Sequence, residues 1–274
     1  MPEADPFPTA EPMPREGQRP RKASNLRTLV ALVMREMSTT YGRSALGYLW
    51  AILEPAAGII LLTAIFSLAF RAPSIGTNFP LFFASGLLPF MAYTDLSQKT
   101  ASALRFSRQL LAYPGVTFID ALMARLVLNT LTHLMIFSVV LTSILVIYRV
   151  DVILDPAAIA LGFGMALYLA AGVGMLNCYL TSTYPVWERA WGILTRPLFF
   201  ISGILFTFES VPRPYSEYLW WNPLIHVIGQ VRSGIYATYD ASYVSHVYVF
   251  LFGGIPMTLG MMLLRRYHRD ILNR

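Results

Sequence analysis

Apolar runs long enough to cross a lipid bilayer recur along this chain of 274 residues, and they constrain its fold more than any other feature. A spanning helix needs about 20 mostly apolar residues. The composition agrees, because 55% of the residues are hydrophobic, only 13% are charged and the mean hydropathy is +0.53. Soluble domains carry about 25% charged residues. Since lipid offers the backbone no hydrogen-bond partners, the runs predict helices, and we expect an all-α integral membrane protein.

Proline content and hydropathy divide the chain into four parts. Residues 1–24 hold six of the 18 prolines and no apolar run, which predicts a disordered cytoplasmic tail and argues against a cleaved signal peptide. We expect an amphipathic interface helix at 25–48, a six-span transmembrane domain at 49–264 and a cytoplasmic C-terminus at 265–274. The six expected spans are 49–70, 80–103, 126–148, 157–185, 190–208 and 247–264.

The later spans contain glycine and proline at informative positions. Arg196-Pro197 interrupts the fifth span, and residues 209–244, which follow it, contain Asn222-Pro223 and Gly234. A straight span exposed to lipid is therefore not expected there, and short re-entrant helices buried against protein fit better. Small residues let helices approach closely in membranes. The fourth span carries four glycines, Gly162, Gly164, Gly172 and Gly174.

The segment 25–48 has the periodicity of an amphipathic helix. Its apolar residues recur at helical spacing, at Leu26, Leu29, Val30, Val33, Met34, Met37 and Tyr41. Arg27 and Arg35 fall on other faces. One interpretation is a helix lying in the membrane interface with its basic face toward anionic lipid head groups. The other is an ordinary amphipathic helix packed on protein.

The distribution of Lys and Arg predicts the orientation of the chain. If the N-terminus lies inside, the cytoplasmic regions hold all but four of the 21 basic residues. The four outside are Arg71, Arg149, Arg213 and Arg232. Because cytoplasmic loops are enriched in Lys and Arg, both termini are expected in the cytoplasm. This bias explains the net charge of +6 without a nucleic-acid partner.

Motifs for ATP or metal chemistry are missing. Only two lysines exist, Lys22 after Arg21 and Lys99 after Gln98, so no Gly-Lys-Ser/Thr phosphate loop is present. If transport uses ATP, another chain must hydrolyse it, and we expect no cofactor on this chain. There is also no His-Glu-x-x-His zinc pattern and no Gly-x-Ser-x-Gly elbow. The single Cys178 excludes an intrachain disulfide and is expected to be a buried apolar side chain.

Ionisable groups at membrane depth are costly, so they are functional candidates. His133 lies in the middle of the third span, either as a neutral imidazole hydrogen-bonded inside the bundle or as a proton relay. Glu54, near the start of the first span, is expected to pair with Arg43 or with a group on another helix, in a structural or a gating role. Asp95 and Lys99, four residues apart, are expected on a solvated helix face.

Residues 105–120 lie in the longest cytoplasmic loop and alternate charged with apolar side chains. The side chains in question are Arg105, Arg108, Leu110, Leu111 and Tyr113, before Pro114-Gly115. Such a pattern favours a short amphipathic helix that docks into a groove of a cytoplasmic partner. The alternative is a loop that rests on lipid head groups.

The loop between the last two spans is rich in aromatic residues. They are Phe206, Phe208, Tyr215, Tyr218, Trp220, Trp221, Tyr236, Tyr239 and Tyr243. Tyr and Trp gather at membrane interfaces, so an aromatic belt is one interpretation. The other is that some of these rings face a channel, where they offer a sugar an apolar face and a polar tip.

The stretch Gly42 to Pro55, here called the hinge segment, turns the chain from the membrane surface into the first span. It reads Gly-Arg-Ser-Ala-Leu-Gly-Tyr-Leu-Trp-Ala-Ile-Leu-Glu-Pro and follows Met34-Arg35-Glu36. With Ile-Ser-Gly-Ile-Leu-Phe at 201–206 and Asn-Pro-Leu-Ile-His at 222–226 through Arg232-Ser233, it resembles membrane subunits of bacterial polysaccharide ABC exporters of the type-2 permease class. The Gly-Arg-Ser start and Glu-Pro end are similar to the capsular polysaccharide exporters of Gram-negative bacteria, of KpsM type.

This resemblance implies a homodimer of six-span subunits in the bacterial inner membrane. Each copy would bind a nucleotide-binding subunit, which holds ATP and Mg, and would export a lipid-linked acidic polysaccharide with periplasmic and outer-membrane export proteins as partners. Two alternatives stay open. One is the same architecture carrying O-antigen or a drug-like amphiphile. The other is a membrane enzyme such as a glycolipid transferase, with His133 and Glu54 as its acid–base pair.

The candidate residues fall into three groups by expected role. Arg43, Arg105 and Arg108 are expected to meet the anionic lipid head or sugar acids at the cytoplasmic mouth, and Trp50, Tyr215, Trp220 and Trp221 to contact the sugar. The expected contacts with the ATPase are Arg105, Arg108, Leu110, Leu111 and Tyr113. The expected hinge residues are Gly42, Gly47, Glu54 and Pro55.

Overall fold

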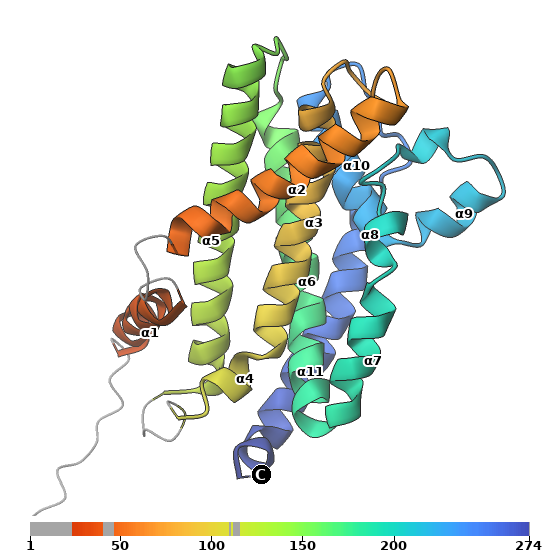
Figure 1. Ribbon diagram of the computed structural model, residues 1–274. Helices are drawn as coiled ribbons and strands as arrows, with labels where there is room; N and C mark the ends of the chain where they lie inside the picture. The colour runs from red at the N-terminus through yellow and green to blue at the C-terminus, as the bar shows by residue number, and fades with distance from the viewer. Residues whose placement is uncertain (1–23, 41–46, 110, 112–115, 274) are drawn as a thin grey trace, which may run out of the picture.

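The protein is a bundle of helices in the computed structural model, which describes residues 24–40, 47–109, 111 and 116–273 (Figure 1). No strand occurs in these ranges. The elements in chain order are α1 (Ser24–Thr40), α2 (Gly47–Ala69), α3 (Phe79–Ala101), α4 (Ala103–Phe106), α5 (Phe118–Tyr148), α6 (Pro156–Thr183), α7 (Pro185–Thr195), α8 (Leu198–Ile201), the 3-10 helix η1 (Phe208–Ser210), α9 (Tyr215–Trp220), α10 (Pro223–Ile235) and α11 (His246–Asn273). In Figure 1, α4 and the C-terminal end of α11 lie at the lower end of the bundle, and α1 lies beside the lower half of α5.

Among the described residues, five helices are long and apolar enough to cross a membrane, namely α2, α3, α5, α6 and α11. The all-α membrane fold is therefore confirmed. The expected fifth span at 190–208 does not form one continuous helix, because α7 ends at Thr195 and α8 at Ile201. Pro197 has no backbone N–H to continue the helical ladder, and Gly203 adopts a left-handed φ of 81°. The six-span count stays a prediction.

The third long helix, α5, begins at Phe118 rather than near residue 126. A capping box starts it: the Thr117 hydroxyl accepts the Asp120 N–H at 3.2 Å, and the Asp120 carboxylate accepts the Thr117 N–H at 2.9 Å. The charged Asp120 and Arg125 lower the hydropathy of the first part of α5, so the apolar pattern predicts a later start. The helix expected across 105–120 is wrong for the described residues, since α4 ends at Phe106 and Asp120 belongs to α5.

Helix α6 packs against α3, α10 and α11 through its glycines. A Cβ atom on Gly172 would overlap the Gly253 carbonyl oxygen of α11, and one on Gly174 would lie 2.9 Å from the Ser97 carbonyl oxygen of α3. A Cβ on Gly162 would lie 2.8 Å from the backbone nitrogen of Val231 in α10. Close packing is thus confirmed at three of the four glycines. Gly164 faces open space, because a Cβ atom there would have no neighbour within 4 Å.

Helix α10 is largely buried and carries the arginine that holds the irregular stretch after α8. Arg232 is 2% exposed and donates hydrogen bonds to the carbonyl oxygens of Phe206 at 2.8 Å and Ile204 at 3.1 Å. Its guanidinium carbon lies 4.3 Å from the centre of the Phe82 ring of α3. These contacts satisfy carbonyl groups that no helix pairs, and buried backbone groups need such partners.

Helix α1 packs against α5, which agrees with the interpretation of an amphipathic helix packed on protein. Leu32 and Glu36, one helical turn apart, are buried in this contact. Val30 and Met34 are exposed, so a second apolar stripe points away from the protein. The placement of α1 in the membrane interface stays a prediction.

We expect Gly172→Ala to destabilise the protein and Gly164→Ala to leave its stability nearly unchanged. The new methyl group at position 172 meets backbone of α11, which cannot move aside as a flexible side chain does, so the free energy of unfolding should fall by about 1–3 kcal/mol. The same change at position 164 meets nothing and should alter it by at most about 1 kcal/mol. Thermal unfolding of both variants in detergent measures the difference. Equal unfolding temperatures would contradict the packing of α6 on α11.

Candidate functional site

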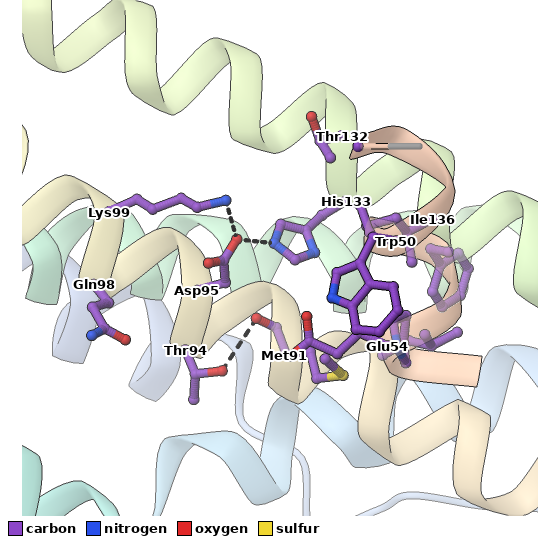
Figure 2. Close-up of a pocket in the computed structure, with 15 residues that line it drawn as sticks. Trp50, Glu54, Met91, Thr94, Asp95, Gln98, Lys99, Thr132, His133 and Ile136 are labelled. Carbon is purple, nitrogen blue, oxygen red and sulfur yellow. Dashed lines mark hydrogen bonds and ion pairs between the residues drawn. The ribbon is translucent and has the colours of Figure 1, made fainter. Parts of the chain in front are cut away.

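A pocket of about 580 Å³ opens between α2, α3 and α5 (Figure 2). Its walls combine apolar side chains with charged and polar ones, although all three helices are candidate membrane spans. Polar groups at membrane depth are costly to bury and mark functional positions. The lining residues are Gly47, Trp50, Ala51, Glu54, Pro55, Leu88, Met91, Thr94, Asp95, Gln98, Lys99, Thr132, His133, Ile136 and Phe137.

Three ionisable side chains join α3 to α5 in this pocket. Asp95 Oδ2 lies 2.8 Å from Lys99 Nζ and 2.8 Å from His133 Nε2 (Figure 2). An ionised carboxylate only accepts hydrogen bonds, so both the ammonium and the imidazole N–H donate to the same oxygen. His133 is 8% exposed, and its ring is held by this bond. We call Asp95, Lys99 and His133 the triad.

All three triad residues are recognisable in the sequence as ionisable groups in apolar segments, but the sequence does not predict that His133 contacts Asp95. The pairing of Asp95 with Lys99 is confirmed, and both side chains are partly exposed and line the open pocket, which agrees with the expected solvated helix face. The partner of His133 does not lie on its own helix but on α3, 38 residues earlier. A signal is present in the sequence: two apolar spans each carry an unusual ionisable group, and such groups tend to pair with one another.

The hinge segment supplies one wall of the pocket. Gly47, Trp50, Glu54 and Pro55 all line it, which places these four predicted residues together. Trp50 is 69% exposed, and Figure 2 shows its indole beside His133 and Glu54. Gly42 and Arg43 lie outside the described residues, so the pairing of Glu54 with Arg43 stays a prediction.

A second, smaller pocket of about 230 Å³ adjoins the first across α3. Thr94 and Gln98, one turn apart on α3, line both pockets. The far wall of the second pocket comes from α6 and α7, with Thr181, Trp191 and Thr195 among its residues. A continuous polar face of α3 is therefore accessible between α2 and α7.

The predicted mouth residue Arg105 lines the second pocket rather than the first. Its guanidinium donates two hydrogen bonds to the Glu188 carboxylate of α7, at 2.7 and 3.0 Å. This bidentate bond lowers the pKa of the Glu188 carboxyl and raises the pKa of Arg105. Both side chains are about half exposed, so the pair sits in the solvent-accessible rim. Arg108 is exposed and lines neither pocket.

The predicted coupling residues are only partly described. Leu110 and Tyr113 lie outside the described residues. Leu111 packs against the small apolar cluster that contains Leu104 and Cys178. Cys178 is fully buried, as expected. Docking of this segment into a partner stays a prediction.

The three aromatic residues predicted in the outer loop lie away from both pockets. Trp220 belongs to a packed cluster: its Nε1–H donates to the Tyr243 carbonyl oxygen at 3.1 Å, and its ring centre lies 5.0 Å from those of His226 and Tyr248. Tyr215 and Trp221 are 65% and 66% exposed. Trp220 thus holds the loop together, whereas the other two rings are accessible.

Comparison with known proteins identifies the family. The sequence model of a family described as ABC-2 type transporter matches residues 27–236. The chain is 32% identical over 245 residues to the polysialic acid transport protein KpsM of Escherichia coli, covering 89% of this chain and 95% of that protein. It is 23% identical over 249 residues to the capsule polysaccharide export inner-membrane protein CtrC of Neisseria meningitidis, covering 89% and 92%. It is 22% identical over 246 residues to the corresponding protein BexB of Haemophilus influenzae, again covering 89% and 92%.

These relatives are named as transport proteins and not as enzymes. Glu54 and His133 do line one pocket, but nothing in the comparisons supports a glycolipid transferase. The family match covers the hinge segment, the triad and α10, and the five apolar helices make the chain a multi-pass membrane protein. The chain therefore belongs to the ABC-2 type transporter family, as a membrane permease.

Proposed function

We propose that this chain is the transmembrane subunit of an ATP-driven exporter that moves lipid-linked capsular polysaccharide across the bacterial inner membrane. The observation that carries the proposal is the accessible polar face of α3, a candidate membrane span. Thr94, Asp95, Gln98 and Lys99 line the first pocket there, and Thr94 and Gln98 also line the second. Charged groups in a span are rare and face a bundle interior or a water-filled path. Relatives named for capsule export support the nature of the cargo.

The chemistry of the first pocket suits a sugar unit. The exposed indole of Trp50 offers a flat apolar face, on which the C–H face of a sugar ring stacks. Gln98 and Thr94 supply neutral donors and acceptors, and the carboxylates of Glu54 and Asp95 accept hydrogen bonds from sugar hydroxyls. Lys99 is the pocket's one fully cationic side chain among the described residues, and the Arg105 guanidinium in the adjoining pocket adds a second cation near an acidic cargo.

A homodimer would convert the open face of α3 into a closed channel. In one chain both pockets open to the outside of the bundle, and α7 beside them exposes Val186, Ile193 and Leu194. A second copy packed on this side would cover these apolar residues and enclose the polar face. We place Arg43, Trp50, Arg105 and Arg108 near its cytoplasmic mouth and the accessible Tyr215 and Trp221 toward its outer end.

The topology of the proposed subunit has both termini in the cytoplasm and six spans. The fifth span, at 190–208, consists of the later part of α7 together with α8, and it is broken at Pro197. Helices α9 and α10 form the re-entrant pair that precedes α11. Helix α4 and the end of α11 lie at the lower end of the bundle and α1 in its lower half, and we assign this half to the cytoplasmic side with its anionic lipids (Figure 1). A separate nucleotide-binding subunit with ATP and Mg docks there, and periplasmic and outer-membrane export proteins receive the polymer.

We expect the purified chain to hydrolyse no ATP alone and to form a dimer that binds two copies of its cognate ATPase subunit. The two lysines of the chain stand in no phosphate loop, so the catalytic groups must come from the partner. Hydrolysis by the reconstituted complex should rise on addition of lipid-linked capsular polysaccharide. Stimulation of ATP hydrolysis by O-antigen and not by capsular polysaccharide would identify O-antigen as the cargo. Sugar transfer by the chain alone would overturn the proposal.

We expect Trp50→Ala to weaken the stimulation of the complex by polysaccharide about tenfold in half-maximal concentration, which corresponds to about 1.4 kcal/mol of lost stacking. Trp50→Phe keeps a ring face and should lose less. Tyr148→Ala, an exposed aromatic at the far end of α5, is the matched control and should behave like the parent. Titrating polysaccharide against ATP hydrolysis measures all three. A normal half-maximal concentration for Trp50→Ala would remove this residue from the path.

A further inference from the structure

A buried arginine lies beneath the first pocket and contacts three other helices. Arg125 of α5 is 6% exposed, and its Nε–H donates to Glu36 Oε1 of α1 at 2.8 Å. Its Nη1 donates to the Lys99 carbonyl oxygen at 2.8 Å and to Ser102 Oγ at 2.9 Å, both at the end of α3. The guanidinium carbon lies 4.0 Å from the centre of the Phe106 ring of α4.

These contacts form one buried polar unit, in which each hydrogen-bonding or charged group has a partner within the unit. The carbonyl of Lys99 is among the last four of α3, which have no partner within the helix, and a cation near a helix C-terminus is favourable. Glu36 is buried as well, so the carboxylate and the guanidinium compensate each other. The space left between α1, α4 and α5 is only about 10 Å³, which is near the minimum for one water.

Lys99 belongs both to this unit and to the pocket. Its backbone carbonyl accepts from Arg125, while its ammonium donates to Asp95 of the triad, which in turn binds His133. A shift of α1 that moves Glu36 therefore moves the Arg125 side chain, which is bonded to it. Arg125 in turn contacts Lys99, the residue whose ammonium lies in the pocket wall. The exposed stripe of α1 with Val30 and Met34 leaves this helix in contact with surroundings outside the bundle.

We propose that Arg125 is a positioning residue that couples movement of α1 and α4 to the shape of the first pocket, with Glu36 as its obligatory partner. The inference rests on the proposed function, because it assumes that an ATPase subunit moves the half of the bundle where α1 and α4 lie. Spatial proximity alone does not show coupling, so the test must measure a change at the pocket that depends on nucleotide.

The experiment reports pocket accessibility by thiol labelling. Cys178 is fully buried, so Cys178→Ala with Gln98→Cys gives a single reactive thiol in the pocket wall. In the complex with the ATPase subunit, the labelling rate is measured with a membrane-impermeant maleimide, without nucleotide and with ATP. Arg125→Lys, Glu36→Gln and the exchange Glu36→Arg with Arg125→Glu are compared in this background. Arg149→Lys, an exposed arginine at the other end of α5, is the control.

We expect both single variants to keep basal ATP hydrolysis and to lose the nucleotide-dependent change in labelling by about fivefold or more, the scale of ordinary coupling between sites. The exchange variant should regain part of it, whereas Arg149→Lys should match the parent. If one single variant fails to accumulate in the membrane, the other decides.

An unchanged ATP response in Arg125→Lys or Glu36→Gln would overturn the coupling role and leave the proposed function intact. A parent complex that binds and hydrolyses ATP without any change in labelling would overturn the coupling role as well. A chain that binds no ATPase subunit would refute the proposed function itself, so the two failures are distinguishable.

Discussion

The close approach of backbone to backbone along α6 is the contact on which the rest of the bundle depends. Lipid tails are as apolar as the side chains of membrane helices, so the association of these helices relies largely on van der Waals packing, which small residues permit. Gly162, Gly172 and Gly174 bring α10, α11 and α3 against three sides of α6. Once these neighbours are fixed, one face of α3 is used for packing and the opposite face stays open. The polar residues Thr94 and Gln98 lie on that open face.

The open face explains why a membrane span tolerates so many polar side chains. The apolar side of α3 is buried against α6 and α5, whereas the polar side lines the two pockets, where Thr94, Asp95 and Lys99 are partly exposed and Gln98 is exposed. Asp95 accepts hydrogen bonds from Lys99 and His133, so the charges are partly neutralised within the chain and the remaining polarity is offered to a ligand. One side of α3 therefore packs against other helices, and the other side is available to a ligand. The division accounts for the lower hydropathy of α3 compared with the other four candidate spans.

Much of this architecture is predictable from the sequence, because long apolar runs and the glycines of α6 have direct physical consequences. Trp50 and Glu54 of the hinge segment line the pocket, and their predicted roles stay predictions. The start of α5 is not predictable from hydropathy, because its capping box and Arg125 are polar. The triad escapes prediction for a different reason: Asp95 and His133 are brought together by the packing of α3 on α5, and no periodicity within one helix reveals a partner on another.

The two arginine–glutamate pairs on either side of α3 differ in burial, and the difference decides what each can do. Arg105 and Glu188 are about half exposed, so solvent screens them and such a pair contributes only about 0–1 kcal/mol. Arg125 and Glu36 are buried, and separating such partners costs about 3–5 kcal/mol because each charge is left without compensation. The buried pair therefore holds α1 to the end of α3 firmly, whereas the exposed pair adds little to the attachment of α7.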